Sequence, residues 1–407
     1  MAPLPTWRRT LITVWSAQLL IMTAFGFALP FVAYYIQDDM GITDQAEVRH
    51  WVALFEAAAP LTMMVFTPIW GMLADRYGRK AMLVRANIGG AVVLGGMALA
   101  PTVEWLLVFR LGQGMLTGVI AASQTLISTA VPDHKRGLAM GALSTSMFGG
   151  VMAGQFLGGL CGDVFGYAAC FQISAGLALL AALAVVLFAD ERFVRPPRAA
   201  LSIVQRLREG LEALAPVLPV IGLLAGITFV FTLERPVMPL LVQELNDGRL
   251  AGTSTRMGTL GSVVCLVGMV GGLAMGRLAD RFSPVLLTAI AAVGGCLTCL
   301  PLATVDSFAQ LLFWRAALML FVSGLPALYQ VWLSRGADAS RHGLVFGMTG
   351  SIRSLGWFLG PLCGTAIATW TGLRGVFVVK GGLMLLFIPG VVVAAWLMSR
   401  SAGRRAL

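Results

Sequence analysis

Charged side chains are scarce in this sequence. Asp, Glu, Lys and Arg make up 12% of its 407 residues, whereas a soluble protein averages about 25%. Hydrophobic residues reach 58%, so water is not the main solvent of the chain. The composition therefore indicates a membrane protein rather than a soluble enzyme or binding domain.

Histidine and the common motifs of phosphate and acyl-transfer chemistry are also lacking. The three histidines, His50, His134 and His342, lie in or beside predicted loops and form no cluster in the sequence. We find no Walker-type phosphate loop and no nucleophile elbow. We therefore expect no enzyme activity, no metal site and no cofactor, and no direct drive by ATP within this chain.

The six cysteines give no disulfide framework, because all of them lie within or beside apolar segments. Cys296 and Cys299 have the spacing of a redox motif, but they sit inside an apolar segment without a strand before them. We expect them to serve packing.

Long apolar runs are what the sequence does contain. We draw twelve segments of roughly 20 residues, the length that a helix needs to cross a hydrocarbon core of about 30 Å. They are 10–36, 51–71, 81–100, 104–129, 138–161, 168–189, 216–241, 256–276, 285–303, 307–332, 343–366 and 375–398. Only helices satisfy every backbone polar group of an open chain in lipid. The sequence therefore predicts an all-α membrane protein with twelve transmembrane helices.

The basic residues are unevenly distributed between alternate loops. If the N-terminus is cytoplasmic, that side holds 19 of the 29 Lys and Arg residues, and five (Arg49, Arg249, Arg256, Arg374 and Lys380) fall on the other side. This positive-inside asymmetry predicts cytoplasmic termini. It also explains the net charge of +10 without a nucleic-acid partner.

The chain repeats itself at an offset of 205 to 206 residues. Residues 71–76, GMLADR, return as 276–281, GRLADR, and Gly166 corresponds to Gly372. Six spans in each half place the halves in parallel topology. We therefore predict an N-terminal half at 1–190, a charged cytoplasmic linker at 191–215 and a C-terminal half at 216–407.

The stretch GMLADRYGRK at 71–80 resembles the signature of the loop between the second and third spans in the major facilitator superfamily, and the whole chain fits that plan. The resemblance implies a cytoplasmic gate, in which Asp75 accepts hydrogen bonds at the N-terminus of span 11 in the other half. The gate residues are Gly71, Asp75, Arg76, Gly78, Arg79 and Lys80, with Asp280 and Arg281 in the weaker second copy.

A glycine pattern in span 5 resembles that of drug:proton antiporters and recurs in span 11. Gln155 stands where the pattern has proline, and Thr365 replaces the last glycine of the second copy. Glycines four residues apart line one helix face, so we expect this face to make close contact with the other half. The positions are Gly141, Gly150, Gly154, Gly158 and Gly159, and Gly347, Gly356, Gly360, Pro361 and Gly364.

Charged side chains inside spans must face the protein interior or a wet cavity, because their exposure to lipid would cost several kcal/mol. Such side chains are candidates for proton coupling. Arg110, in the stretch RLGQG, is similar to an element that the family implicates in coupling, and Arg315 takes its place in the second half. Glu56 and Glu234, the latter beside Arg235, are the candidate proton carriers. The alternatives are a structural ion pair for Glu234 and a wet outer vestibule for Glu56.

Together these features predict a proton-coupled exporter of small amphipathic compounds, including drugs, in a bacterial inner membrane. We expect a monomer that works by alternating access. A dedicated exporter of one metabolite, such as a siderophore, and an uptake symporter for sugars or organic acids remain alternatives. An anion symporter should show paired basic residues near mid-membrane, and the sequence shows no such pair.

Overall fold

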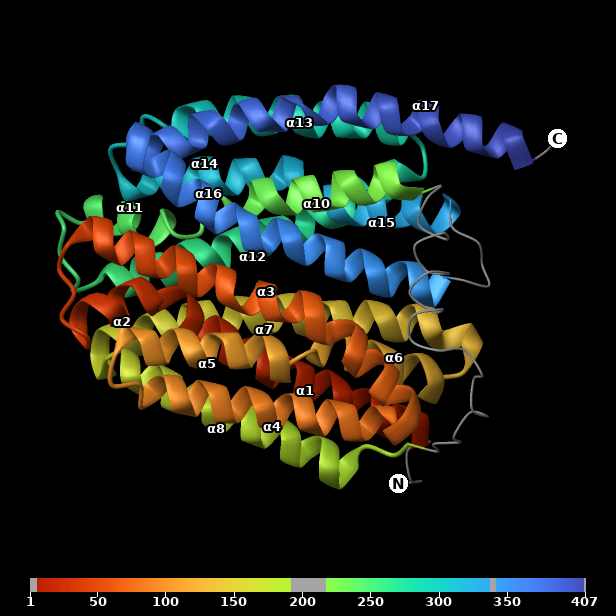
Figure 1. The fold of residues 1–407 in the computed structure, drawn as a ribbon, viewed down its shortest axis with the longest axis horizontal. Coiled ribbons are helices and arrows are strands. Elements are labelled where there is room, and N and C mark those ends of the chain that lie inside the picture. The colour runs from red at the N-terminus through yellow and green to blue at the C-terminus, as the bar shows by residue number, and fades with distance from the viewer. Residues whose placement is uncertain (1–5, 192–216, 337–341, 406–407) are drawn as a thin grey trace. The chain divides into compact units, whose positions relative to one another are not determined.

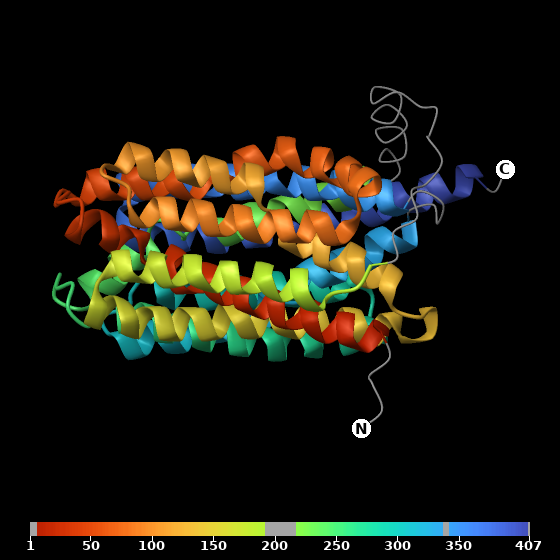
Figure 2. The same cartoon turned by 90° about the horizontal axis from the view of Figure 1, so that it is seen from below.

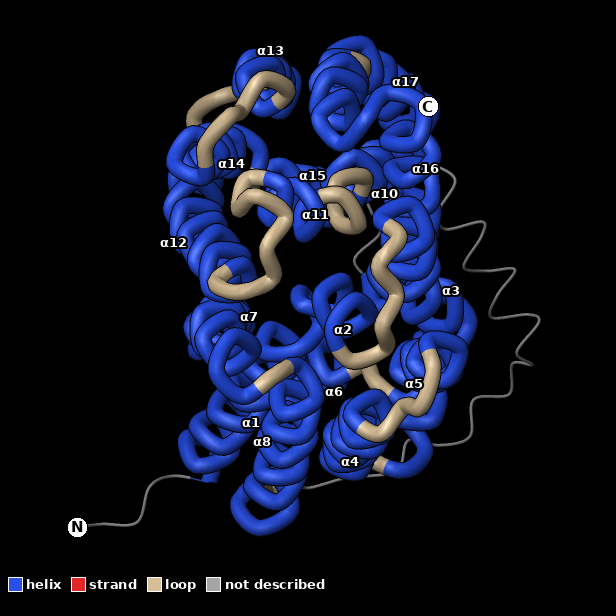
Figure 3. Tube along the Cα trace, turned by 90° about the vertical axis from the view of Figure 1, so that its left-hand side faces the viewer, coloured by secondary structure: helices blue, strands red, loops and turns tan. Residues whose placement is uncertain are grey.

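The computed structural model describes residues 6–191, 217–336 and 342–405. Within these ranges every regular element is a helix, and the end-on view in Figure 3 shows no strand. The predicted all-α class is therefore confirmed. The predicted linker at 191–215 lies, apart from its first residue, outside the described residues.

The chain divides into two compact units, Met1–Arg198 with Val242–Cys265, and Ala199–Leu241 with Leu266–Leu407. The first unit thus includes a segment that the sequence assigns to the second half. Up to Phe188 the helices of this unit are α1 (Thr6–Ala28), η1 (Leu29–Phe31), α2 (Val32–Asp38), α3 (Gln45–Tyr77), α4 (Arg79–Ala98), α5 (Val103–Leu116), α6 (Val119–Ala130), η2 (Asp133–Lys135), α7 (Arg136–Phe165) and α8 (Tyr167–Phe188). The long α-helices among them run along the long axis of Figure 1.

Within this unit α1 packs against α7 and α8, and α4 packs against α5 and α8. Figure 2 shows α8, in yellow-green, beside α1, in red. The helices of the rest of the chain are α10 (Leu218–Thr232), α11 (Met238–Glu244), α12 (Thr253–Ala279), α13 (Pro284–Leu302), α14 (Phe308–Val322), α15 (Leu325–Gly336), α16 (His342–Leu385) and α17 (Phe387–Arg405). In the second unit α16 packs against α10 and α13.

Each predicted span falls on one helix or on two consecutive helices. Nine segments of the described chain are long and apolar enough to cross a membrane, and one of them, Thr349–Met398, covers most of the predicted span 343–366 and all of the predicted span 375–398. The glycine-rich α7 and the shorter α10, Leu218–Thr232, complete the twelve spans. Gly372, at φ 78°, separates the two spans inside α16, as Gly166 at φ 82° separates α7 from α8. Positive φ favours glycine, which explains why the repeat keeps it at both turns.

Local sequence explains where helices begin. Asp44 caps α3, because its carboxylate accepts the backbone N–H groups of Ala46 and Glu47, each at 3.2 Å. Ser283 caps α13 in the same way through Leu286 N, with Pro284 in the first turn. Glu191 from the end of α8 takes this role at α4, where its two oxygens accept the N–H groups of Arg79 and Lys80, both at 2.8 Å.

The first unit also contains a polar contact between α2 and the Val242–Cys265 segment. The side-chain amides of Gln37 and Gln243 donate to each other's oxygens at 3.0 and 2.9 Å, and both residues are buried. Asp163, at the end of α7, accepts the N–H and hydroxyl of Thr255 at 2.8 and 2.6 Å. It thereby binds the first turn of α12.

Candidate functional site

Four spans of the described chain are interrupted at corresponding places of the sequence repeat, and the last span has a further break at Leu386. In the first unit the breaks lie at Leu29–Phe31, between α1 and α2, and at 117–118, between α5 and α6. Their counterparts are 233–237, between α10 and α11, and 323–324, between α14 and α15. Discontinuous helices at matching positions of two halves are typical of transporter binding sites, because their ends present unpaired backbone groups. Charged side chains near these breaks are therefore candidates for a binding or coupling site.

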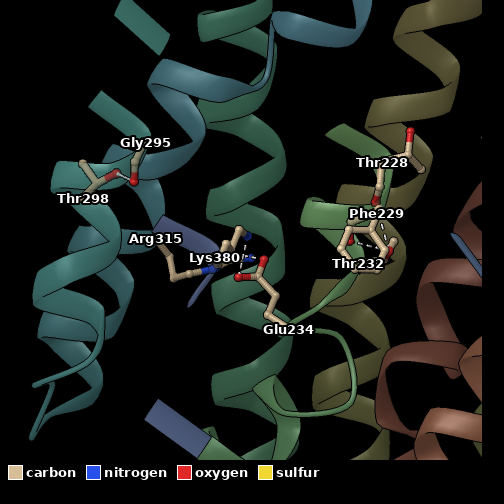
Figure 4. Close-up of polar contacts among 8 residues, drawn as sticks. All are labelled: Thr228, Phe229, Thr232, Glu234, Gly295, Thr298, Arg315 and Lys380. Carbon is tan, nitrogen blue, oxygen red and sulfur yellow. Dashed lines mark hydrogen bonds and ion pairs between the residues drawn. The ribbon is translucent and has the colours of Figure 1, made fainter. Parts of the chain in front are cut away.

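The break between α10 and α11 holds a buried ion cluster, shown in Figure 4. Glu234 lies in this break, Arg315 lies on α14 and Lys380 lies on α16. Glu234 Oε1 is 2.5 Å from Arg315 Nη1, and Glu234 Oε2 is 2.7 Å from Lys380 Nζ. One carboxylate therefore joins three helical segments of the second unit. We call these three residues the Glu234 cluster.

The Glu234 cluster is almost fully enclosed. Glu234, Arg315 and Lys380 expose 4%, 8% and 0% of their surface. The neighbouring residues Leu233 and Val237 belong to an apolar core with residues of α16. Charges removed from water in this way cost several kcal/mol each unless they are paired. The ion pairs are therefore required by the burial of these side chains.

The charges of the Glu234 cluster do not cancel. Two cations and one carboxylate leave a net charge of +1. Protonating Glu234 in this arrangement would leave Arg315 and Lys380 without a counter-ion at low dielectric. Proton uptake on Glu234 would thus require it to move away from both cations.

Arg110 occupies the corresponding place in the first unit, where it contacts a carbonyl, an amide and an aromatic ring. Its Nε donates to Phe55 O at 3.2 Å, and its Nη1 donates to Gln113 Oε1 at 2.5 Å. The guanidinium also lies 4.5 Å from the centre of the Phe55 ring. With 6% exposure, Arg110 faces the interior of its unit, as its position in a span requires.

The two remaining predicted coupling residues lie elsewhere. Glu56 is a partly buried residue of α3 and follows Phe55, whose carbonyl binds Arg110. Arg235 is exposed, directly after Glu234 in the break between α10 and α11. The structure therefore brings together Glu234 and Arg315, and it places Glu56 near the Arg110 backbone contact.

The expected cytoplasmic gate is described only in part. Gly78, at φ 93°, joins α3 to α4, and Lys80 Nζ donates to Val186 O at 3.0 Å. Arg76 lies 5.4 Å from the centre of the Tyr77 ring, and the backbone of Arg79 binds Glu191. The space around Gly71 is open. Exposed Asp280 and Arg281 follow the end of α12. The side chain of Asp75 and those at the start of α16 lie outside the described residues, so their contact stays a prediction.

Most of the glycine pattern packs against the first span of its own repeat, and only Gly159 among its described members makes the expected contact with the other half. Gly150, Gly154 and Gly158 face α1, and a Cβ added at Gly150 would lie 2.7 Å from Leu19 O. Gly356, Gly360 and Gly364 face α10 in the same way. Glycines four residues apart share one face, and that face meets the first span of the same repeat. Gly159, on the neighbouring face, contacts Ser254 O near the start of α12 instead.

The other members of the pattern lie elsewhere on α7 and α16. Gly141 has open space around it. Gly347 and Pro361 lie in α16, and Pro361 is inside its helical part.

Lys380 was assigned wrongly from the sequence. The distribution of basic residues predicts Lys380 on the outer side, yet Lys380 is fully buried in α16 and contacts Glu234. The expectation that no paired basic residues occur is wrong for the same reason, because Arg315 and Lys380 share one carboxylate. The sequence did contain a signal for this ion pair, because a lysine inside an apolar span needs a counter-ion.

Comparisons with known proteins agree with this architecture. The family model of the Major Facilitator Superfamily matches residues 14–283 and 220–406. Multidrug resistance protein MdtG of Salmonella paratyphi B is 31% identical over 385 residues, which cover 93% of each chain. MdtG of Salmonella typhimurium has the same identity and coverage.

Solved structures resemble the chain at lower identity and support the fold alone. The nucleoside transporter NupG has a TM-score of 0.75 at 15% identity and covers 96% of this chain and 99% of its own. The human organic anion transporter MFSD10 has a TM-score of 0.69 at 17% identity and covers 97% and 100%. With a family model and relatives that both span nearly its whole length, the chain belongs to the Major Facilitator Superfamily.

Proposed function

We propose that this protein is a secondary active transporter that exports small amphipathic compounds, including drugs, in exchange for protons. The observation that carries this proposal is the 31% identity to multidrug resistance proteins over 93% of the chain. The antiporter-type glycine face, which packs spans 5 and 11 on spans 1 and 7, supports it. Like other proteins of this fold, the chain would work by alternating access.

We further propose an inner-membrane location with both termini in the cytoplasm. With Lys380 inside the second unit, the loops hold 19 basic residues on one side against four on the other. The carrier would act as a monomer, with protons as the coupling ion and without a cofactor, metal or catalytic reaction.

Two carboxylates are the candidate proton carriers, and their different burial suggests different roles. Glu234 is held by two cations, so it would accept a proton only after the cluster opens. Glu56 lies on α3 and is partly buried. We propose that Glu56 carries the proton and that Glu234 keeps the second unit's charges balanced.

The test uses the purified full chain in vesicles that contain a pH-sensitive dye. A lipophilic cationic dye is added with and without an imposed pH gradient. Glu56→Gln should abolish substrate-dependent proton movement, while binding of the dye persists. The conservative variant Glu56→Asp should retain part of the movement. If proton movement persists in Glu56→Gln, Glu56 does not carry the proton.

The basic pair of the Glu234 cluster favours one second candidate, a carrier of organic anions. Its net positive charge would stabilise a substrate carboxylate or phosphate if Glu234 moved aside. Counterflow distinguishes the two, because vesicles loaded with an unlabelled acid would accumulate its labelled form only if the chain carries anions. The exporter hypothesis predicts that the vesicles exchange cationic dyes and do not exchange simple acids.

A further inference from the structure

A groove runs along the surface of α4 in the first unit. Its volume is about 770 Å³, within the range of about 300–1,000 Å³ that ligand sites occupy. Tyr77, Lys80 and Arg85 lie toward one end, and Ile88, Val92 and Leu116 line the remainder. The groove therefore has a cationic end and an apolar length.

The groove has the dimensions of a lipid tail. From Lys80 to Val92 the helix rises by about 18 Å, and half of the hydrocarbon core measures about 15 Å. Ile88 and Val92 expose 44% and 59% of their surface. A molecule lying along this face would extend from the edge of the bilayer to its middle.

The charges at the polar end leave a positive surplus. Glu191 lines the same end, but both its oxygens are taken by the backbone N–H groups of α4. Among the described residues, the hydrogen bond of Lys80 Nζ goes to a neutral carbonyl, that of Val186. Two cations therefore face one carboxylate that is already engaged.

Arg85 adds unused donors to this end of the groove. It stacks on Trp70, with its guanidinium 3.4 Å from the ring centre, and Nη2 donates to Thr117 O at 3.3 Å. Its Nε and Nη1 are buried without an acceptor among the described residues. An anionic oxygen entering from the groove would satisfy them after a small movement of the side chain.

We propose that this groove binds an anionic phospholipid. One acyl chain lies along Ile88, Val92 and Leu116, and the phosphate contacts Lys80 and Arg85. Lipid is the molecule that an exposed apolar face meets in a membrane, and the surplus charge selects an anionic headgroup. This inference does not rest on the proposed transport activity.

The test measures lipid retention by native mass spectrometry of the full chain in mild detergent. Phosphatidylglycerol is the anionic probe, and phosphatidylcholine is the zwitterionic comparison. Lys80→Gln should weaken phosphatidylglycerol binding about fivefold, the effect expected for one cation near a lipid surface. Ile88→Trp fills the groove and should abolish retention of the tightly bound molecule.

Matched controls are Lys135→Gln, outside the groove, and Leu180→Trp on α8, where Leu180 is 55% exposed. Both should retain phosphatidylglycerol as the unmodified protein does. Equal retention of the two lipids would overturn the anionic assignment. Unchanged retention in Lys80→Gln and Ile88→Trp would overturn the site.

A second measurement does not depend on those variants folding. A photoreactive benzophenone side chain placed at Val92 should cross-link the acyl chain of phosphatidylglycerol in preference to that of phosphatidylcholine. The same group at Leu180 should cross-link both lipids equally. Equal cross-linking at Val92 would contradict the proposal.

Discussion

At the scale of single residues, the corresponding buried arginines of the two units make different contacts. Arg315 is paired with Glu234, whereas Arg110, its counterpart 205 residues earlier, binds a carbonyl and an amide. Lys380 corresponds to Ser174, a buried residue whose hydroxyl donates to the Cys170 carbonyl. The Glu234 cluster therefore contains a cation, Lys380, that the corresponding position of the first unit lacks. This asymmetry gives the Glu234 cluster its net charge.

We predict that the members of the Glu234 cluster differ in their effect on stability. Glu234→Gln leaves two buried cations unpaired and should cost about 3–5 kcal/mol. Lys380→Met leaves the 1:1 pair of Glu234 with Arg315, so it should cost less. Thermal unfolding of the purified variants in one detergent gives the order, and a lower midpoint for Lys380→Met than for Glu234→Gln would refute it.

The same cluster predicts a compensating double variant. In Glu234→Gln with Lys380→Met only one buried cation lacks a counter-ion, so part of the stability lost in Glu234→Gln should return. Additive losses in the double variant would show that the two side chains do not interact.

At the scale of helices, backbone contact at glycine sets the packing of α7 on α1. A Cβ at Gly150 would lie 2.7 Å from Leu19 O, whereas Gly141 on the same helix has open space. Close contact of this kind replaces the hydrophobic drive that is missing between helices in lipid.

These two glycines form a matched pair for mutation. Gly150→Ala should destabilise the protein by about 1–3 kcal/mol, because α1 and α7 must separate. Gly141→Ala should be neutral or up to about 1 kcal/mol stabilising, since alanine favours helix. Thermal unfolding of both variants is the measurement, and equal midpoints would contradict the packing described.

The turn between the last two spans gives a fourth prediction. Gly372 has a φ of 78°, whereas Gly382 lies in the helical part of α16. At neither glycine would an added Cβ meet another atom within 4 Å. Gly372→Ala should therefore cost roughly 1–2 kcal/mol through backbone strain alone. Gly382→Ala should cost nothing. A comparable loss in both variants would mean that steric contact, rather than φ, limits position 372.

At the scale of the whole molecule, the sequence was sufficient for the fold. Apolar runs of span length and the 71–80 signature predicted the helices and the family, because lipid leaves an open chain only the helix. The repeat also marked Gly166 and Gly372, whose shared turn the structure confirms. These features depend on local composition or on spacing along the chain.

The site was less predictable, because its contacts join distant residues. Glu234 and Lys380 are 146 positions apart, and no local pattern says which cation a buried carboxylate binds. Lys380 was misplaced because span ends are uncertain by several residues. Periodicity defines a helix face but not the helix that covers it, so the sequence did not show that most of the glycine face meets the first span of its own repeat and that Gly159 alone meets α12.

The measurement that tests the central claim most directly is dye uptake into everted inner-membrane vesicles containing the protein. In these vesicles export appears as uptake, and respiration makes the lumen acidic. The account predicts uptake of a lipophilic cationic dye that stops when nigericin collapses the pH gradient and is absent in Glu56→Gln. Uptake that continues without the gradient, or dye uptake only in vesicles of the opposite orientation, would contradict proton-driven export.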